Sequence, residues 1–439
     1  MRLLAAENGG SERTRPQRRR PEGLRQFSGS ATHSRSLPCM RIRRKLPRRM
    51  PQPRLAPGQK RSSGYLLPEA ERRRLSVGPL YFFCRSASAC RKHMHDDCKR
   101  MMTMPSLAHS EVALPATIYL EPTNRCNLRC RTCVQHRGLA ESARDMSLDE
   151  AKWIADQFPA LEIVVLHGIG EPLLNDDIFG MVAYFKARGA YVLFNSNAIL
   201  LDRPKAERLM TTGLDELRIS LDAGSASTYA GIRPGASFAS IVRNIEDLIA
   251  LKAEFSRSTP MISAWMIGTR DNIHDLPDLV RLAARIGIEE VYLQRLVYFL
   301  NDAGHGAAVR EQAIVDPPPQ IQAVLDESMQ LSRRWGIRLN ASGLTSPEQS
   351  LRSESKSGAP WRRCRRPWES TYITVQGNVL SCCIAPFSNS DYAALIFGNV
   401  FAQRFEAIWH GDTYSRFRRR HQSFSPPPGC SGCGVEWSL

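Results

Sequence analysis

The sequence predicts an α/β fold whose main part is a partial (β/α)6 TIM-like barrel, preceded by a basic segment. Two observations support this prediction. Six short runs of β-branched or apolar residues recur between residues 117 and 293, and segments with 3.6-residue periodicity separate them. The first 100 residues hold 25 Lys and Arg against 7 Asp and Glu, whereas the other 339 hold 35 against 36. Strands and helices that alternate in this way form a curled parallel sheet with the helices on its outer side.

The predicted strands share a short length and buried character. They are Thr117–Leu120, Glu162–Leu166, Tyr191–Phe194, Glu216–Leu221, Met261–Met266 and Glu290–Leu293. In barrels of this kind the functional residues gather at the carboxyl ends of the strands. We therefore expect the site to lie on the loops that follow these six runs.

The predicted helices have recognisable start and stop signals. One begins after Asn175 and ends at Gly189, a second runs from about Ser237 to Phe255, and a third ends before Gly287. A further helix is expected to end at about Trp335, and the polar stretch 346–360 is predicted to be a linker.

The amino-terminal segment 1–105 is rich in Arg, Pro and Ser and shows no apolar period that could bury a core, which predicts disorder. Three interpretations stay open: a tail for nucleic acid or a membrane surface, an organelle transit peptide, or an annotation artefact with translation starting at Met101, Met102 or Met104. No run has the length of a membrane helix. Clustered metal-ligand cysteines favour a reducing compartment, so we expect a cytoplasmic protein.

Three cysteines follow the first predicted strand with C-x3-C-x2-C spacing: Cys126, Cys130 and Cys133. Three thiolates on one loop can hold three irons of a four-iron cluster and leave the fourth iron open for chemistry. A zinc knuckle is the alternative, although structural zinc usually takes four ligands from two pairs.

The stretch from Ile118 through these three cysteines resembles the cluster loop of radical S-adenosylmethionine (SAM) enzymes. The resemblance implies that the open iron of a catalytic [4Fe–4S] cluster binds SAM. It further implies reductive cleavage of SAM to a 5′-deoxyadenosyl radical, which abstracts a hydrogen atom from the substrate. The cofactor then supplies the difficult chemistry, and the protein positions the reactants and excludes competing reactions.

The second strand is followed by His167-Gly168-Ile169-Gly170-Glu171-Pro172. Glycines at a strand end let a ligand approach the backbone closely. A carboxylate at the same place can accept a hydrogen bond from an ammonium group. The segment resembles the Gly-Gly-Glu-Pro element of radical SAM enzymes, which holds the SAM amino group. The resemblance therefore assigns Gly168, Gly170, Glu171 and Pro172 to the cofactor.

Three further residues follow the third and fourth strands: Asn195, Ser220 and Arg233. Small polar residues at strand tips are also common turn formers, so that interpretation stays open. In the resembling family these positions contact the ribose, the carboxylate or the substrate. For Arg233 the expectation is an ion pair with the SAM carboxylate or with the substrate, and a surface arginine is the alternative.

The carboxyl-terminal region carries a second set of cysteines. The run from Tyr372 to Ser381 predicts a hairpin with Gly377 near its turn, which would bring Cys364 and Cys382 together. Cys430 and Cys433 would then complete a four-thiolate site, with Cys383 as a spare or an alternative ligand. The arrangement resembles the SPASM/twitch extension of radical SAM enzymes, which implies one auxiliary [4Fe–4S] cluster. A zinc site is the alternative.

These observations predict a radical SAM oxidoreductase with a barrel at 112–300, a connecting region at 301–360 and an auxiliary-cluster domain at 361–439. The resemblance implies a peptide or a small aminocyclitol- or sugar-like molecule as substrate and an electron donor such as flavodoxin or ferredoxin. The alternative is a non-enzymatic zinc protein associated with nucleic acid through its basic tail. It is the weaker hypothesis because it gives the Glu171 element and the barrel repeats no role.

Overall fold

A computed structural model describes residues 112–137, 140–298, 308–343, 345–352, 360–387, 392–427, 429–430 and 433. The basic segment 1–105, with its predicted disorder and its four cysteines, lies outside these ranges. Within them, no helix combines the length and the apolar character needed to cross a membrane.

The described residues form one ten-stranded sheet with the order β10-β9-β8-β1-β2-β3-β4-β5-β6-β7. Strands β8, β1, β2, β3, β4, β5, β6 and β7 pair in parallel with one another in that order. The first seven are β1 Thr117–Leu120, β2 Ile163–Val165, β3 Tyr191–Ser196, β4 Glu216–Ser220, β5 Met261–Gly268, β6 Glu290–Arg295 and β7 Arg338–Ala341. Six of them confirm the predicted α/β barrel, and the sequence analysis missed the seventh.

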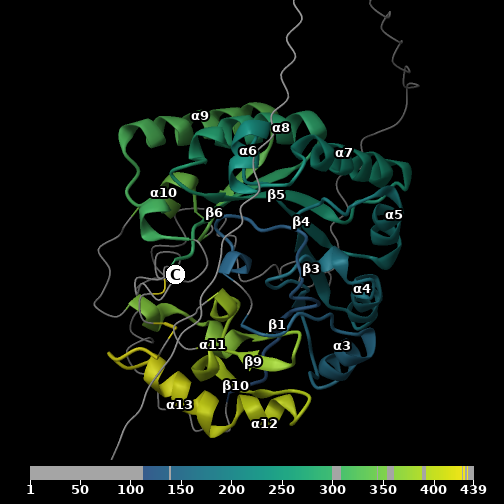
Figure 1. The fold of residues 1–439 in the computed structure, drawn as a ribbon, viewed down its shortest axis with the longest axis vertical. Coiled ribbons are helices and arrows are strands. Elements are labelled where there is room, and N and C mark those ends of the chain that lie inside the picture. Colours follow the sequence, from purple (N-terminus) through teal and green to yellow (C-terminus); the bar gives the residue numbers. More distant parts are fainter. Residues whose placement is uncertain are drawn as a thin grey trace, which may run out of the picture. The chain divides into compact units, whose positions relative to one another are not determined.

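Helices cover the outer side of this curved sheet (Figure 1). They are α3 Leu148–Ala155, α4 Ile178–Ala187, α5 Arg203–Thr212, α6 Ala226–Ile232, α7 Phe238–Glu254, α8 Leu276–Ile286, α9 Pro319–Trp335 and α10 Pro347–Leu351. Helix α10 lies in the stretch for which the sequence predicts a linker. That prediction was wrong there because Ser346 caps the helix by accepting from the backbone N–H of Gln349, and Leu351 is buried.

The helix ends agree with the local sequence signals. Ser147 and Glu150 form a capping box at the start of α3, which satisfies backbone donors at both positions. Helix α8 ends at Gly287, whose φ of 92° lies in the left-handed region that glycine tolerates. Helix α9 ends in the same way at Gly336.

Alternate residues of each strand face the helices or the inside of the curved sheet. On β5, Ile262, Ala264 and Met266 belong to the main apolar core with the helices. Trp265 lies on the opposite face, where it stacks on Tyr292 of β6 with ring centroids 4.0 Å apart. The barrel therefore has an apolar outer layer and a partly polar, aromatic inner wall.

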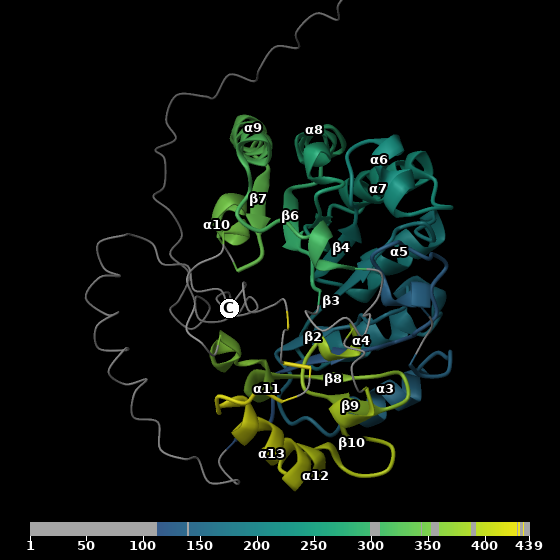
Figure 2. The ribbon, with the colours of Figure 1, turned by 60° about the vertical axis from the view of Figure 1, so that its left-hand side comes forward.

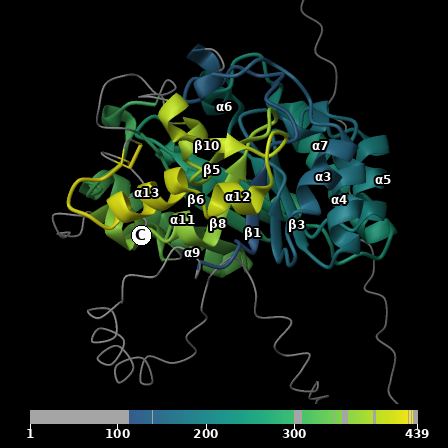
Figure 3. The same cartoon turned by 90° about the horizontal axis from the view of Figure 1, so that it is seen from below.

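The carboxyl-terminal region extends the same sheet (Figure 2). Strand β8 Ser370–Ile373 pairs in parallel with β1, and β9 Asn378–Leu380 and β10 Ile396–Asn399 follow in antiparallel order. Gly377, with φ of 83°, lies in the turn between β8 and β9, as the predicted hairpin requires. Helix α11 is Arg366–Glu369. Helix α12 Phe405–Trp409 packs against β10, and α13 Asp412–His421 contacts Phe397 of β10 through Tyr414 and Phe417 (Figure 3).

Glu121 joins the two regions at the end of β1. One carboxylate oxygen accepts from the backbone N–H of Ile169 and from the hydroxyl of Tyr372, both at 2.9 Å. The other accepts from the backbone N–H of Val375 at 3.0 Å. Burial raises the pKa of Glu121 to about 7, although these three hydrogen bonds act in the opposite direction.

Replacing Glu121 by Gln removes this buried titrating group. Since the pKa of Glu121 is raised from 4.5 to about 7 in the folded chain, its contribution to stability is present below pH 4.5 and is lost as the pH rises through 7. We expect the denaturant midpoint of the wild type to fall relative to that of Glu121→Gln over this window, by the equivalent of about 3 kcal/mol at most. A midpoint difference that does not change with pH contradicts this assignment.

Candidate functional site

The first cysteine set lies on the loop that follows β1. Cys126, Cys130 and Cys133 are free and half-buried. The loop is fixed from two sides: the backbone N–H of Arg131 donates to the carbonyl oxygen of Ile232 at the end of α6, at 3.1 Å, and the side chain of Asn197 donates to that of Asn127 at 2.8 Å.

Gly170 lets the loop after β2 approach the cysteine loop closely. A Cβ atom at this position would lie 2.3 Å from the carbonyl oxygen of Thr123 and 2.5 Å from that of Arg125. The backbone N–H of Glu171 donates to the same Arg125 oxygen at 2.8 Å. Gly168 has a different neighbour, because its Cβ would lie 2.4 Å from the Glu121 carboxylate. Both glycines therefore make room for protein atoms.

Glu171 lies buried between the ends of β2 and β3. Its carboxylate accepts from the hydroxyl of Ser196 at 2.8 Å, from the backbone N–H of Asn197 at 2.7 Å and from that of Leu173 at 3.2 Å. Burial raises the pKa of Glu171, while these donors act against the shift. Pro172 begins the short 3-10 helix Pro172–Leu174, which Glu171 caps. In this structure the carboxylate of Glu171 orders the strand ends that face the cysteine loop.

Arg233 is a buried cation beside the cysteine loop, so the alternative of a surface arginine does not hold. Its guanidinium donates to Asp222 at 2.8 Å, and the second oxygen of Asp222 accepts from the backbone N–H of Ile267 at 2.9 Å. Burial acts to lower the pKa of Arg233, but the charges of Asp222 and Cys130 raise it overall. Burial raises the pKa of all three thiols, and the fixed positive charge of Arg233 acts against that shift.

Asn195 and Ser220 lie where they were expected, at the carboxyl ends of β3 and β4. Both are half-buried, and Ser220 is opposite Trp265 in the register of β4 and β5. The structure thus brings the three cysteines, Glu171 and Arg233 close to one another, and it places Asn195 and Ser220 on the same edge of the sheet.

Tyr229 on α6 is a site residue that the sequence analysis missed. Its side chain is buried, its hydroxyl has no hydrogen-bond partner, and its charged neighbours are Arg233, Asp222, Cys130 and Glu171. An unpaired buried hydroxyl costs free energy unless a bound group satisfies it. The free hydroxyl of Tyr229 could therefore donate to a cofactor held by the cysteine loop. A tyrosine in a helical run carries no sequence signal for such a role.

Three thiols on one loop are a donor set that fits a four-iron cluster. In the ranges that the structure describes, no three His, Cys, Asp or Glu side chains are grouped as ligands of one metal ion. The cysteines of a four-iron cluster each bind a different iron and need not converge on one point. Burial raises the pKa of Cys133 to about 11, so metal binding would have to displace its proton.

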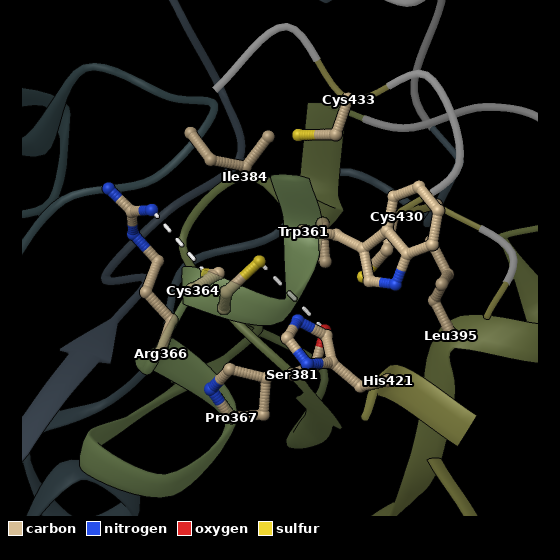
Figure 4. A pocket seen from close by; sticks show the side chains of 13 residues that line it. Trp361, Cys364, Arg366, Pro367, Ser381, Ile384, Leu395, His421, Cys430 and Cys433 are labelled. Atoms are coloured by element: carbon tan, nitrogen blue, oxygen red, sulfur yellow. Dashed lines mark hydrogen bonds between the residues drawn. The ribbon is translucent and has the colours of Figure 1, made fainter. Parts of the chain in front are cut away.

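The second cysteine set lines one cavity in the carboxyl-terminal region (Figure 4). Cys364, Cys382, Cys430 and Cys433 contribute to its wall, together with Trp361, Arg366 and His421. The cavity contains about 570 Å³ of space without protein atoms, part of it open to solvent. Three segments far apart in the sequence supply these thiols, which are the four that the sequence analysis grouped.

Two of these thiols have hydrogen-bond donors beside them. Arg366 donates to the sulfur of Cys364 at 3.8 Å, and the hydroxyl of Ser381 donates to the sulfur of Cys382 at 3.9 Å. Burial raises the pKa of Cys382 to about 12. Donors that face sulfur suit a thiolate-bound cluster, because they stabilise its negative charge.

Cys383 lies outside this cavity. It interacts with Tyr119 on β1, whose pKa is raised chiefly by the charge of Cys383 and by burial. Of the two adjacent cysteines, only Cys382 contributes to the cavity wall among the residues described.

Comparison with known proteins agrees with this geometry. Residues 120–283 match the radical SAM superfamily, and residues 364–434 match the SPASM iron–sulfur cluster-binding domain. The chain is therefore a radical SAM enzyme. It belongs to the members of this superfamily that carry a carboxyl-terminal SPASM domain, and its cofactors are SAM and iron–sulfur clusters.

Two curated relatives and one solved structure illustrate the similarity. An AdoMet-dependent heme synthase of Nitratidesulfovibrio vulgaris is 25% identical over 71% of this chain and 85% of its own. A PqqA peptide cyclase of Xanthomonas campestris is 27% identical over 75% and 82%. Streptococcus suis SuiB bound to precursor peptide SuiA covers 84% of this chain and 80% of its own, with a TM-score of 0.55 and 15% identity, and so shows a shared fold.

Gly170→Ala tests the close approach of the two loops. The added methyl group would meet two backbone carbonyl oxygens, so we expect the cysteine loop to shift and 5′-deoxyadenosine formation from SAM to fall about a hundredfold. Gly231→Ala is the matched control, because a Cβ there has no neighbour within 4 Å. Equal activity of the two variants, measured by chromatography under strict anaerobiosis, contradicts the role of Gly170.

Proposed function

We propose that this chain is a radical SAM oxidoreductase in which Cys126, Cys130 and Cys133 hold the catalytic [4Fe–4S] cluster. When bound, this cluster supplies the electron that cleaves SAM and so generates the radical that removes a hydrogen atom from the substrate. The arrangement that supports the proposal is a three-thiol loop at the carboxyl end of β1, with Arg233 beside it and the unpaired hydroxyl of Tyr229 nearby. Three ligands leave one iron open for SAM.

The surrounding residues would bind and orient SAM. Gly168, Gly170, Glu171 and Pro172 would form the wall that faces the SAM amino group. Because the carboxylate of Glu171 is occupied by Ser196 and two backbone donors, its part is to hold that wall in place. Arg233 would face the SAM carboxylate from its ion pair with Asp222, and Asn195 and Ser220 would contact the ribose or the substrate.

Cys364, Cys382, Cys430 and Cys433 would hold one auxiliary [4Fe–4S] cluster. All four line one cavity, and a cluster with four protein ligands has no open iron. Its role would be to accept the electron left on the substrate after hydrogen abstraction. A flavodoxin or ferredoxin in the cytoplasm would supply and remove electrons.

A peptide is the substrate class that we propose first. The supporting observations are the similarity to a PqqA peptide cyclase and the fold shared with SuiB, whose structure contains a precursor peptide. A small molecule is the second candidate. The similarity to a heme synthase favours it, as does the inner wall of the barrel, where Arg218 lies 4.4 Å from the ring centre of Trp265 and Trp265 stacks on Tyr292. Stacked rings next to a cation suit a planar or anionic group.

Iron content and SAM cleavage test the cofactor assignment together. The anaerobically reconstituted chain should hold about eight irons and form 5′-deoxyadenosine under reductant. Cys126→Ala should hold about four irons and form none, whereas Cys382→Ala should lose about four irons and still cleave SAM. Cys383→Ala is the matched control and should keep all of its iron, because Cys383 lies outside the cavity.

The same measurements can overturn each part of the proposal separately. Retained 5′-deoxyadenosine formation in Cys126→Ala removes the catalytic assignment. Four irons and one zinc in the wild type would make the auxiliary site structural, as the zinc alternative holds. Equal iron loss in the Cys382→Ala and Cys383→Ala variants would show that the cavity does not distinguish the two cysteines.

A further inference from the structure

His421, the last residue of α13, lines the auxiliary cavity (Figure 4). Its side chain is fully buried, and neither ring nitrogen has a hydrogen-bond partner. Burying a polar group without a partner costs free energy. An unpaired imidazole in the wall of a cavity that four cysteines also line points to a bound group that one of its nitrogens meets.

The ring of His421 is held in one orientation. Trp368 meets it edge-on with centroids 5.2 Å apart, and Phe417 lies 6.4 Å away on the same helix. Helix α13 is itself anchored by Arg418, which donates to the carbonyl oxygen of Pro367 at 2.9 Å and to that of Trp409 at 2.7 Å. The imidazole is therefore packed against the cavity by its neighbours.

The other donors in the cavity wall already have partners. Arg366 faces Cys364, Ser381 faces Cys382, and the indole of Trp361 donates to the carbonyl oxygen of Ser423 at 3.2 Å. His421 is the side chain of this wall for which the described residues offer no acceptor. What remains in front of it is the space that the four cysteines surround.

We propose that His421 is a positioning residue that donates a hydrogen bond from its ring N–H to a sulfur atom of the auxiliary cluster and thereby raises the reduction potential of that cluster. This inference rests on the proposed function, because it requires a cluster in this cavity. The hydrogen bond involves no transfer of the proton. Reduction adds one electron to the cluster, and the N–H dipole stabilises the added negative charge.

The direction of the effect follows from this charge. Without the donor, the reduced form loses more stabilisation than the oxidised form, so the midpoint potential becomes more negative. Arg366 and Ser381 remain in place and continue to act on Cys364 and Cys382. Loss of His421 should therefore change the potential while the four ligands stay intact.

The test uses the full chain with Cys126, Cys130 and Cys133 replaced by Ala, so that only the auxiliary cluster contributes to the signal. In this background His421→Phe removes both nitrogens and keeps a flat ring, and His421→Gln keeps an N–H donor. The control is His274→Phe, at a side chain that is 60% exposed. Each variant is titrated with dithionite and followed by electron paramagnetic resonance, with iron content measured in parallel.

We expect His421→Phe to keep about four irons. Its cluster should need a tenfold higher ratio of reduced to oxidised mediator for half-reduction, which corresponds to a midpoint potential about 59 mV more negative for a one-electron couple. His421→Gln should recover most of this difference, and His274→Phe should match the parent. In the parent, pulsed resonance on chain labelled with ¹⁵N-histidine should show coupling of the cluster to a histidine nitrogen, and His421→Gln should lose it.

Three results separate the possible failures. If the parent holds no iron in this cavity, the auxiliary-cluster proposal fails, and the inference about His421 fails with it. If the parent holds about four irons and shows no histidine coupling, the inference about His421 alone is overturned. The inference about His421 is also overturned if His421→Phe keeps about four irons and has the same midpoint potential as the parent. Because the coupling is measured on the parent, a variant that does not fold leaves the test intact.

Discussion

The hydrogen bonding of β1 is the constraint on which both sites depend. This strand pairs with β2 on one side and with β8 on the other, and its last residue is followed by Glu121, whose carboxylate joins the loop after β2 to Tyr372 and Val375. The three-cysteine loop begins five residues later. The cysteine loop follows the carboxyl end of β1, whereas the auxiliary cavity lies near the amino end of its neighbour β8. A shift of β1 would therefore affect both the cysteine loop and the cavity.

Much of the barrel could be predicted from the sequence because its signals are local. Apolar runs gave six strands, and glycines such as Gly287 marked helix ends through a left-handed backbone that few other residues adopt. These strands and helix ends depend on neighbours within a few residues, which is what a pattern can record. The grouping of Cys364, Cys382, Cys430 and Cys433 came instead from the predicted hairpin and the resemblance to the SPASM/twitch extension.

The remainder depends on contacts between distant residues. The pairing of β8 with β1 joins positions about 250 residues apart, so no sequence pattern shows that the carboxyl-terminal hairpin extends the barrel sheet. The partner of Arg233, the unpaired hydroxyl of Tyr229 and the buried imidazole of His421 are set by packing, and a single arginine, tyrosine or histidine in a helix has no distinguishing pattern. The occupied carboxylate of Glu171 also has no sequence signal, since its partners Ser196 and Asn197 lie at the end of a different strand, β3.

The position of β8 has a consequence for how the chain reaches this structure. β1 is made early in synthesis, and its second neighbour emerges about 250 residues later. Until then one side of β1 exposes unpaired backbone groups, which is the condition under which strands associate with other chains. Contacts of such long sequence separation also form slowly. The carboxyl-terminal hairpin therefore covers the β1 edge of the barrel in addition to carrying cysteines, and this edge stays without its second neighbour in the nascent chain until β8 has been made.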